Sequence, residues 1–208
     1  MPVKRYVEQV DRNRYYYFDD FGGGNYDSRT WGVGGTAGGG VAKLSAIGGQ
    51  IRVTVGGTAG NEYYIVQDTF RNFNVSGPCE ISLFAKIENL ANFSAQFGFQ
   101  TDGTHHIEIA SDSATSTNWV CWCQNGAGGG NLTQVISGLA VDTNWHRLRI
   151  LCSAASVSFF VDSTLIGTIV TNIPAGDLGP IAYGYRNAGG AGTRSFLVDW
   201  CEAIGARA

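Results

Sequence analysis

Short runs of alternating apolar and polar residues follow one another along most of the chain. Successive side chains of a β-strand point to opposite faces, so this alternation predicts strands with one face in a core. Gly, Asn and Asp clusters separate the runs, as turns require. Only 88–93 could form a helical turn. The predicted strands are 41–47, 50–56, 62–68, 79–87, 94–100, 105–110, 118–123, 132–137, 146–152, 156–162, 164–170, 180–186 and 194–203.

The clearest alternation lies in 146–152, where apolar residues at every second position define a core face with His146 at its rim. The runs 156–162 and 164–170 then predict a hairpin that turns on Asp162-Ser163, with Ser163 left-handed or part of a longer loop. Trp145, His146 and Arg147 gather here, but no nucleophile with a placed acid accompanies the histidine. We interpret this stretch as scaffold, with His146 packed beside Trp145.

So many antiparallel strands with one apolar face must close on themselves or stack, because one open sheet would expose its apolar face and its edges. The sequence therefore predicts an all-β fold, a two-sheet antiparallel jelly-roll sandwich. The 208 residues suit one domain, and 44% hydrophobic residues supply a core. We expect a short N-terminal arm at 1–18 and the sandwich at 19–208.

The proposed arm is the one cationic part of the chain. Four basic residues stand against two acidic ones in the first 14 residues, while the whole chain has a net charge of -3. The arm is either a solvated terminus or an assembly segment that docks on an acidic neighbour. No concentrated basic face is visible, so nucleic acid is not an expected partner. The basic residues are Lys4, Arg5, Arg12 and Arg14.

The chain contains five cysteines, so at least one cannot pair within it. The first residues lack the apolar core of a signal peptide, and no run approaches the 18 apolar residues of a membrane span. We expect synthesis in a reducing cytosol and no membrane partner. Cys121 and Cys123 are too closely spaced for a redox or zinc half-site, so the cysteines are interpreted as buried small hydrophobic residues.

Four segments together resemble a known superfamily. "DTNWHRLRI", "VSFFVDSTLIGTI" with the "IP" that follows it, and "RSFLVDW" resemble the concanavalin A-like lectin/glucanase superfamily, especially its laminin-G-like branch. The resemblance implies a jelly-roll sandwich. It also implies that "YYYFDDF" is an N-terminal strand lying beside the closing strand.

For catalysis, the resemblance implies two carboxylates on one strand, in an E-x-D-x-(x)-E pattern. No such triplet is found, and Glu108 is interpreted as the only acid of its strand, on one face with His106. This pair is read as solvent-facing polar residues, as glycan contacts, or as an acid/base or metal pair. No catalytic residue is assigned, and the chain is expected not to be an enzyme.

A structural calcium ion and a glycan are the two ligands considered. The resemblance implies calcium at Asp199 and Asp20, with Asp19 nearby, although these acids could instead face solvent or pair with arginines. A sugar needs an aromatic platform and fixed polar groups, and Trp119, Trp122 and Tyr185 join His106 and Glu108 as candidates. Trp119 and Trp122 lie on opposite faces of their strand, so only one can belong to the core.

These observations favour a non-catalytic structural or adhesion module. A β-sandwich without a signal peptide resembles phage virion proteins, either head decoration or tail-associated, made in the host cytoplasm. Its partners would then be other virion proteins or copies of itself, together with a cell-surface glycan. The alternatives are a free carbohydrate-binding lectin and a glycan hydrolase or lyase of the same fold. No cofactor is expected beyond the calcium ion.

Overall fold

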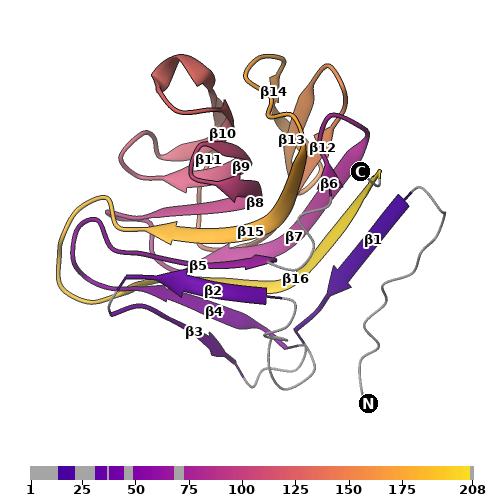
Figure 1. Cartoon of the computed structure of the whole chain (residues 1–208). Helices are drawn as coiled ribbons and strands as arrows, with labels where there is room; N and C mark the ends of the chain where they lie inside the picture. Colours follow the sequence, from indigo (N-terminus) through magenta and orange to yellow (C-terminus); the bar gives the residue numbers. More distant parts are fainter. Residues whose placement is uncertain (1–13, 22–30, 37, 45–48, 68–72, 207–208) are drawn as a thin grey trace.

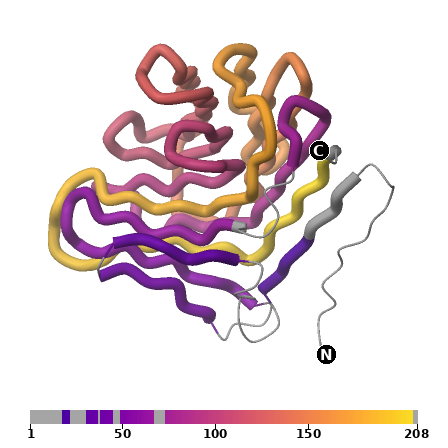
Figure 2. Tube along the Cα trace, in the orientation of Figure 1, coloured from indigo at the N-terminus to yellow at the C-terminus, as the bar shows by residue number. Residues whose placement is uncertain are grey.

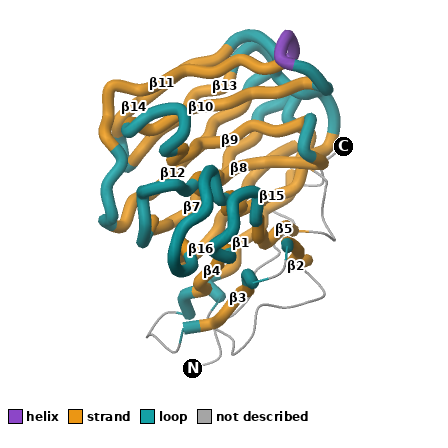
Figure 3. The backbone as a smooth tube through the Cα atoms, turned by 90° about the vertical axis from the view of Figure 1, so that its left-hand side faces the viewer, coloured by secondary structure: helices purple, strands orange, loops and turns teal. Residues whose placement is uncertain are grey.

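The computed structural model describes residues 14–21, 31–36, 38–44, 49–67 and 73–206. These residues form two antiparallel sheets packed face to face, so the predicted all-β two-sheet sandwich is confirmed (Figure 1). The helical content of the described part is the short η1, Gly129–Asn131, at the periphery (Figure 3). Residues 88–93 form turns without a helix.

Sheet A follows the order β14-β13-β12-β7-β16-β4-β3. The long β16 pairs with β4 along its first half and with β1 along its second half, so β1 extends the sheet beside the C-terminal end. The strands are β1 (Arg14–Asp19), β3 (Gly40–Lys43), β4 (Ile51–Val55), β7 (Cys79–Ile87), β12 (Trp145–Cys152), β13 (Val157–Val161), β14 (Thr164–Ile169) and β16 (Arg194–Ala206).

Sheet B follows the order β11-β10-β9-β8-β15-β5-β2, and the two-residue β6 pairs with the start of β15. Neighbouring strands of this sheet are often distant in sequence, because β15 lies between β8 and β5. The strands are β2 (Trp31–Gly35), β5 (Glu62–Gln67), β6 (Phe73–Asn74), β8 (Ser94–Asp102), β9 (His105–Asp112), β10 (Asn118–Asn125), β11 (Leu132–Ala140) and β15 (Asp177–Tyr185).

The N-terminal strand lies beside the closing strand, as the resemblance implied. β1 pairs with β16 from Arg14 opposite Ala206 to Asp19 opposite Cys201, and the indigo and yellow ends run side by side (Figure 2). The boundary of the arm at residue 18 is therefore wrong for 14–18, whose backbone belongs to sheet A. Of the assembly-arm residues, Arg14 begins β1, whereas Lys4, Arg5 and Arg12 lie outside the described residues.

The core fills the space between the sheets with alternate residues of both. In β8, for example, Phe97 and Phe99 are fully buried in the core, whereas Gln96 before them and Gln100 after them face outward. All five cysteines are buried and unpaired, as expected from their interpretation as small hydrophobic residues. Alternation along the strands therefore selects which side chains are left for the outer faces.

The hairpin of β13 and β14 turns on two residues, as predicted, but its left-handed residue is Asp162, with φ of 55°. Aspartate tolerates this conformation better than most residues. Its carboxylate accepts hydrogen bonds from the Arg147 backbone amide and the His146 ring. His146 lies at the rim, yet it packs edge-on against Trp119 rather than beside Trp145, whose ring stacks on Phe84. The polar side chains of this hairpin and of the strand before it therefore bond one another, and we interpret the region as scaffold.

Candidate glycan-binding groove

A groove of about 730 Å³ lies on the outer face of sheet B, the face turned away from sheet A. Strands β2, β5, β15, β8 and β9 and the β8–β9 turn build it, and their outward-pointing residues are mainly aromatic, amide and acidic. Its walls are Gly32, Val33, Glu62, Tyr64, Val66, Gln96, Gln100, Thr101, Asp102, Gly103, His106, Ile181, Tyr183 and Tyr185. We call this set the groove.

Tyr183 is the best-anchored aromatic residue of the groove. Its hydroxyl donates a hydrogen bond of 2.6 Å to Glu62 Oε2, and its ring stacks on that of Tyr64 with centroids 6.2 Å apart. Burial, the hydrogen bond to Glu62, and the charges of Glu62 and Glu108 raise the pKa of Tyr183 well above its usual value. Tyr183 is therefore a neutral hydrogen-bond donor to Glu62.

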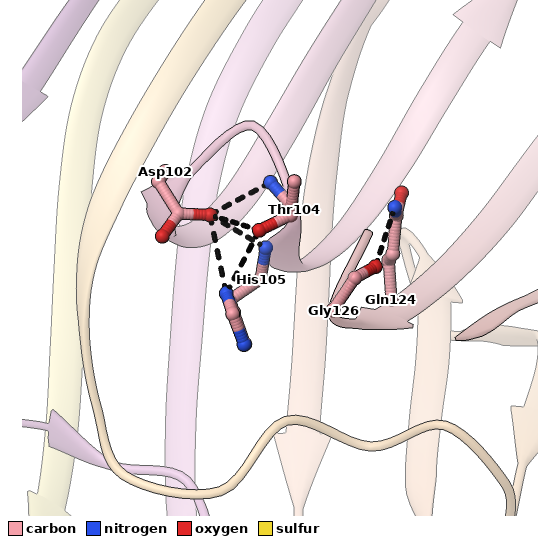
Figure 4. A network of polar contacts seen from close by, with 5 residues as sticks. All are labelled: Asp102, Thr104, His105, Gln124 and Gly126. Atoms are coloured by element: carbon pink, nitrogen blue, oxygen red, sulfur yellow. Dashed lines mark hydrogen bonds and ion pairs between the residues drawn. The ribbon is translucent and has the colours of Figure 1, made fainter. Parts of the chain in front are cut away.

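The turn after β8 fixes one end of the groove. Asp102 Oδ1 accepts hydrogen bonds from the Thr104 hydroxyl, from the backbone amides of Thr104 and His105, and contacts His105 Nδ1 at 3.2 Å (Figure 4). The side-chain and backbone hydrogen bonds of Thr104 hold the pKa of Asp102 well below its usual range. Asp102 is therefore an ionised carboxylate at neutral pH, held by its own turn. Gln124, which bonds the Gly126 carbonyl, belongs to the neighbouring β10.

Glu108 lies on the groove side of β9, but it is only 1% exposed, which corrects the expectation that it faces solvent. Its Oε2 is buried and has no hydrogen-bond partner. Burial raises the pKa of Glu108 to about 8. An acid with this pKa is protonated at neutral pH and can donate a proton, the property that tuned carboxyl groups of active sites share.

Gly98, the cross-strand neighbour of Glu108 on β8, brings the two strands unusually close. A Cβ at Gly98 would lie 2.0 Å from the Ile107 carbonyl oxygen and 2.9 Å from the Glu108 Cα. No other residue type fits this approach without moving the backbone. Gly98 also pairs with Ile181 of β15, which is a wall of the groove. Because Gly98 has no side chain, no side chain of β8 stands between Glu108 and Ile181.

Of the two tryptophans, Trp119 is the core residue. Trp119 is 1% exposed, so it is not a glycan platform in this fold. Trp122 of β10 pairs with Glu108 of β9, and both residues lie on the outer face of sheet B. The His106 ring lies 6.5 Å from that of Trp122, and burial lowers the pKa of His106 to about 4. His106 is therefore neutral at physiological pH. The Trp122 Nε1 is buried without a partner.

Asp112 is an acid of β9 that the sequence analysis missed. β9 extends to residue 112, beyond the predicted end at 110, and its regular register puts Asp112 four residues from Glu108 on the same face. Glu108 is thus not the only acid of the strand. The Asp112 carboxylate accepts hydrogen bonds from the Thr115 hydroxyl and the Asn187 amide. The run Glu108-x-Ala110-x-Asp112 has carboxylates at both ends and an alanine between them.

Tyr185 and the predicted calcium residues occupy separate places. Tyr185 is one of the groove walls, and its role in glycan binding stays a prediction. Asp20 lies near Asp199, whose pKa is raised by burial and by the charge of Asp20. Asp19 instead accepts hydrogen bonds from the Trp31 indole and the Phe21 amide. The described residues include no group of three or more His, Cys, Asp or Glu placed to hold a metal, so calcium at Asp20 and Asp199 stays a prediction.

No protein-family model and no curated protein matches the chain. Solved structures similar to it include a Bacillus licheniformis β-glucanase, at 16% identity with a TM-score of 0.66, covering 90% of this chain and 97% of that one. A β-1,3-1,4-glucanase (lichenase) from a mouse hindgut metagenome has 15% identity and a TM-score of 0.68, covering 90% and 98%. A pseudo β-1,3-glucanase of Mycobacterium tuberculosis has 13% identity and a TM-score of 0.66, covering 91% and 98%.

The chain thus has the concanavalin A-like jelly-roll fold of these glucanases, as its sequence motifs implied. The comparisons contradict two functional predictions. Most of the similar structures are glucanases or other glycoside hydrolases, one is a protein of unknown function from Shewanella oneidensis, and none supports a virion role, so the interpretation as a non-catalytic virion module is corrected. The expectation that the chain is not an enzyme is corrected on the same ground. Among the described residues, no helix is long and apolar enough to span a membrane.

Proposed function

We propose that this protein is a glycoside hydrolase that binds a polysaccharide segment along the groove and uses Glu108 as the proton donor. The observation that carries the proposal is a buried carboxyl group with a pKa of about 8 on the groove side of a glucanase fold. A glycosidic oxygen must be protonated as it leaves, and an acid that is still protonated at neutral pH meets that need.

The groove is suited to a neutral glycan. Tyr64, Tyr183 and Tyr185 provide aromatic rings for the apolar faces of sugar units, and Gln96 and Gln100 provide amides for their hydroxyls. The charged residues among its walls are Glu62 and Asp102, while His106 is neutral because burial lowers its pKa to about 4. An anionic polysaccharide would be repelled by these two carboxylates. A neutral polysaccharide is therefore the substrate class that we infer.

Asp112 is the second carboxylate of the proposal. It follows Glu108 by four residues on the same face of β9, and about 13 Å separates the two Cα atoms of such a pair in an extended strand. The E-x-D-x-(x)-E pattern of glucanases spaces its outer carboxylates in the same way or by one residue more. Here the outer positions are Glu and Asp and the central one is Ala110. Hydrogen bonds from Thr115 and Asn187 fix the position of the Asp112 carboxyl group.

Product release from neutral polysaccharides tests the proposal. Soluble β-1,3- and β-1,3-1,4-glucans and other neutral glycans would be incubated with the purified protein, and the oligosaccharides separated by chromatography. We expect Glu108→Gln and Asp112→Asn each to lower the rate at least about 100-fold. Glu202→Gln, a carboxyl group of β16 in sheet A, is the matched control and should leave the rate unchanged. Full activity of Glu108→Gln, or no product from any neutral glycan, would overturn the proposal.

A further inference from the structure

Cys79 and Cys152 are directly opposed on neighbouring strands. They are Cα partners at the end of the antiparallel pair β7 and β12. Each alternates with buried residues of its own strand, Ile81 after Cys79 and Ile150 before Cys152, so both side chains point to the core face of sheet A. The two thiols therefore lie next to one another on the same face of the sheet.

The backbone geometry of this pair suits a covalent bond between the two sulfurs. Opposed residues of an antiparallel pair have Cα atoms about 4.5 or 5.5 Å apart. Disulfides join residues whose Cα atoms are about 4.4–6.8 Å apart. Both alternatives for an opposed pair fall within that range, so the strands need not move apart or together.

Exposure also separates this pair from the other cysteines. Cys79 and Cys152 are each 5% exposed at the end of their strands, whereas Cys121, Cys123 and Cys201 are at 0%. A small oxidant reaches the strand ends before it reaches the centre of the core. The pair is thus both aligned for a bond and nearest to solvent.

We propose that Cys79 and Cys152 are an oxidisable pair that forms a cross-strand disulfide on reaction with a small-molecule disulfide such as oxidised glutathione. One thiolate attacks a glutathione sulfur and releases one glutathione as thiol. The second protein thiolate attacks the resulting mixed disulfide and releases the other glutathione. Two protein thiols are oxidised and one glutathione disulfide is reduced to two thiols, so the electrons balance.

The surroundings of the pair set the rate of this reaction. The neighbouring Cys79 thiol, together with burial, raises the pKa of the Cys152 thiol well above its usual value. Since only the thiolate attacks, oxidation is slow at neutral pH and becomes faster as the pH rises. The bond would persist once formed, because the thiols it replaces lie in a packed core.

The disulfide would affect the whole groove side of the molecule. The chain between Cys79 and Cys152 includes β8, β9, β10 and β11, and therefore Glu108 and its neighbours in sheet B. Closing so long a loop restricts the unfolded chain, and this stabilises the fold. We expect the Tm of the oxidised protein to rise by about 10 °C.

Thiol counting and peptide mapping test the proposal without any glycan. The full chain would be incubated with oxidised glutathione at alkaline pH, denatured, and its free thiols counted. We expect the count to fall from five to three, with one bridged peptide pair that contains Cys79 and Cys152. Cys79→Ser should prevent both the bridge and the rise in Tm. Cys201→Ser, a cysteine buried in β16, is the control and should still form the bridge.

Three outcomes would overturn the inference. The first is a count of five thiols after oxidation of the folded protein. The second is a bridge between Cys123 and Cys152, a pair close enough for their charges to interact. The third is glutathione attached to Cys79 or Cys152 with no bridge. None of these outcomes depends on hydrolysis, so the inference and the proposed function can fail separately.

Discussion

The Tyr183 hydroxyl donates a hydrogen bond of 2.6 Å to the Glu62 carboxylate, joining residues that are 121 positions apart in the sequence. The bond links β15 to β5 within the groove and orients both side chains. We expect Tyr183→Phe to lower the free energy of unfolding by about 1–2 kcal/mol, because a hydrogen bond to a charged group is lost. Urea unfolding measures this change. Tyr185→Phe removes a hydroxyl from the same groove and should change stability by less than about 0.5 kcal/mol.

Glu108 should make stability depend on pH. Its pKa is raised from 4.5 to about 8 in the folded protein, so between these values the folded state binds more protons than the unfolded chain. Stability therefore falls as pH rises from about 4.5 to about 8, by a total of the order of 4 kcal/mol. Thermal unfolding from pH 5 to pH 9 measures the fall, which Glu108→Gln should reduce. An unchanged slope in this variant would show that Glu108 is ionised throughout.

His146 should add a smaller contribution of the same sign. Burial lowers its pKa, but hydrogen bonds and charges of Asp162 and Asp142 outweigh burial, and the net pKa is raised. Its contribution is complete below the unfolded pKa of 6.5 and is lost as pH rises through the raised folded value. We expect His146→Gln to lower the free energy of unfolding by about 1 kcal/mol at pH 5.5 and by less at pH 9.

His105, whose carboxylate partner is Asp102, is the control for His146. His105 contacts Asp102 at 3.2 Å, and both side chains are more than one-third exposed. His105→Gln should therefore change stability by less than about 0.5 kcal/mol at either pH. Equal losses in the two variants would mean that His146 is not held more firmly by its two aspartates.

Gly98 should tolerate no side chain. A Cβ there would lie 2.0 Å from the Ile107 carbonyl oxygen, so β8 and β9 would have to separate beside Glu108. We expect Gly98→Ala to lower the free energy of unfolding by at least about 2 kcal/mol, as measured by urea unfolding. Gly103→Ala, where a Cβ would meet nothing within 4 Å, should be close to neutral. A stable Gly98→Ala protein would contradict the close approach of the strands.

Periodicity predicted most of the strands, but it did not predict β2 or β6, and β1 was expected only from the resemblance. The predicted run 79–87 coincides with β7, and the core face of β12 with His146 at its rim is as the alternation indicated. β9 and β15 differ at their ends, because β9 continues to Asp112 and β15 begins at Asp177. Strand ends depend on the partner strand rather than on local alternation. The acid at the end of β9 was missed for that reason.

Local residue pattern thus determined the fold class, the two-residue hairpin at Asp162 and which side of each strand enters the core, because alternation is a property of neighbouring residues. The chemistry of the groove was decided by strand order. Because β15 lies between β8 and β5, Tyr183 reaches Glu62. Because β9 lies between β8 and β10, Glu108 is buried beside Gly98 and Trp122. Burial and contacts between distant segments set a pKa, and neither can be read from spacing along one strand.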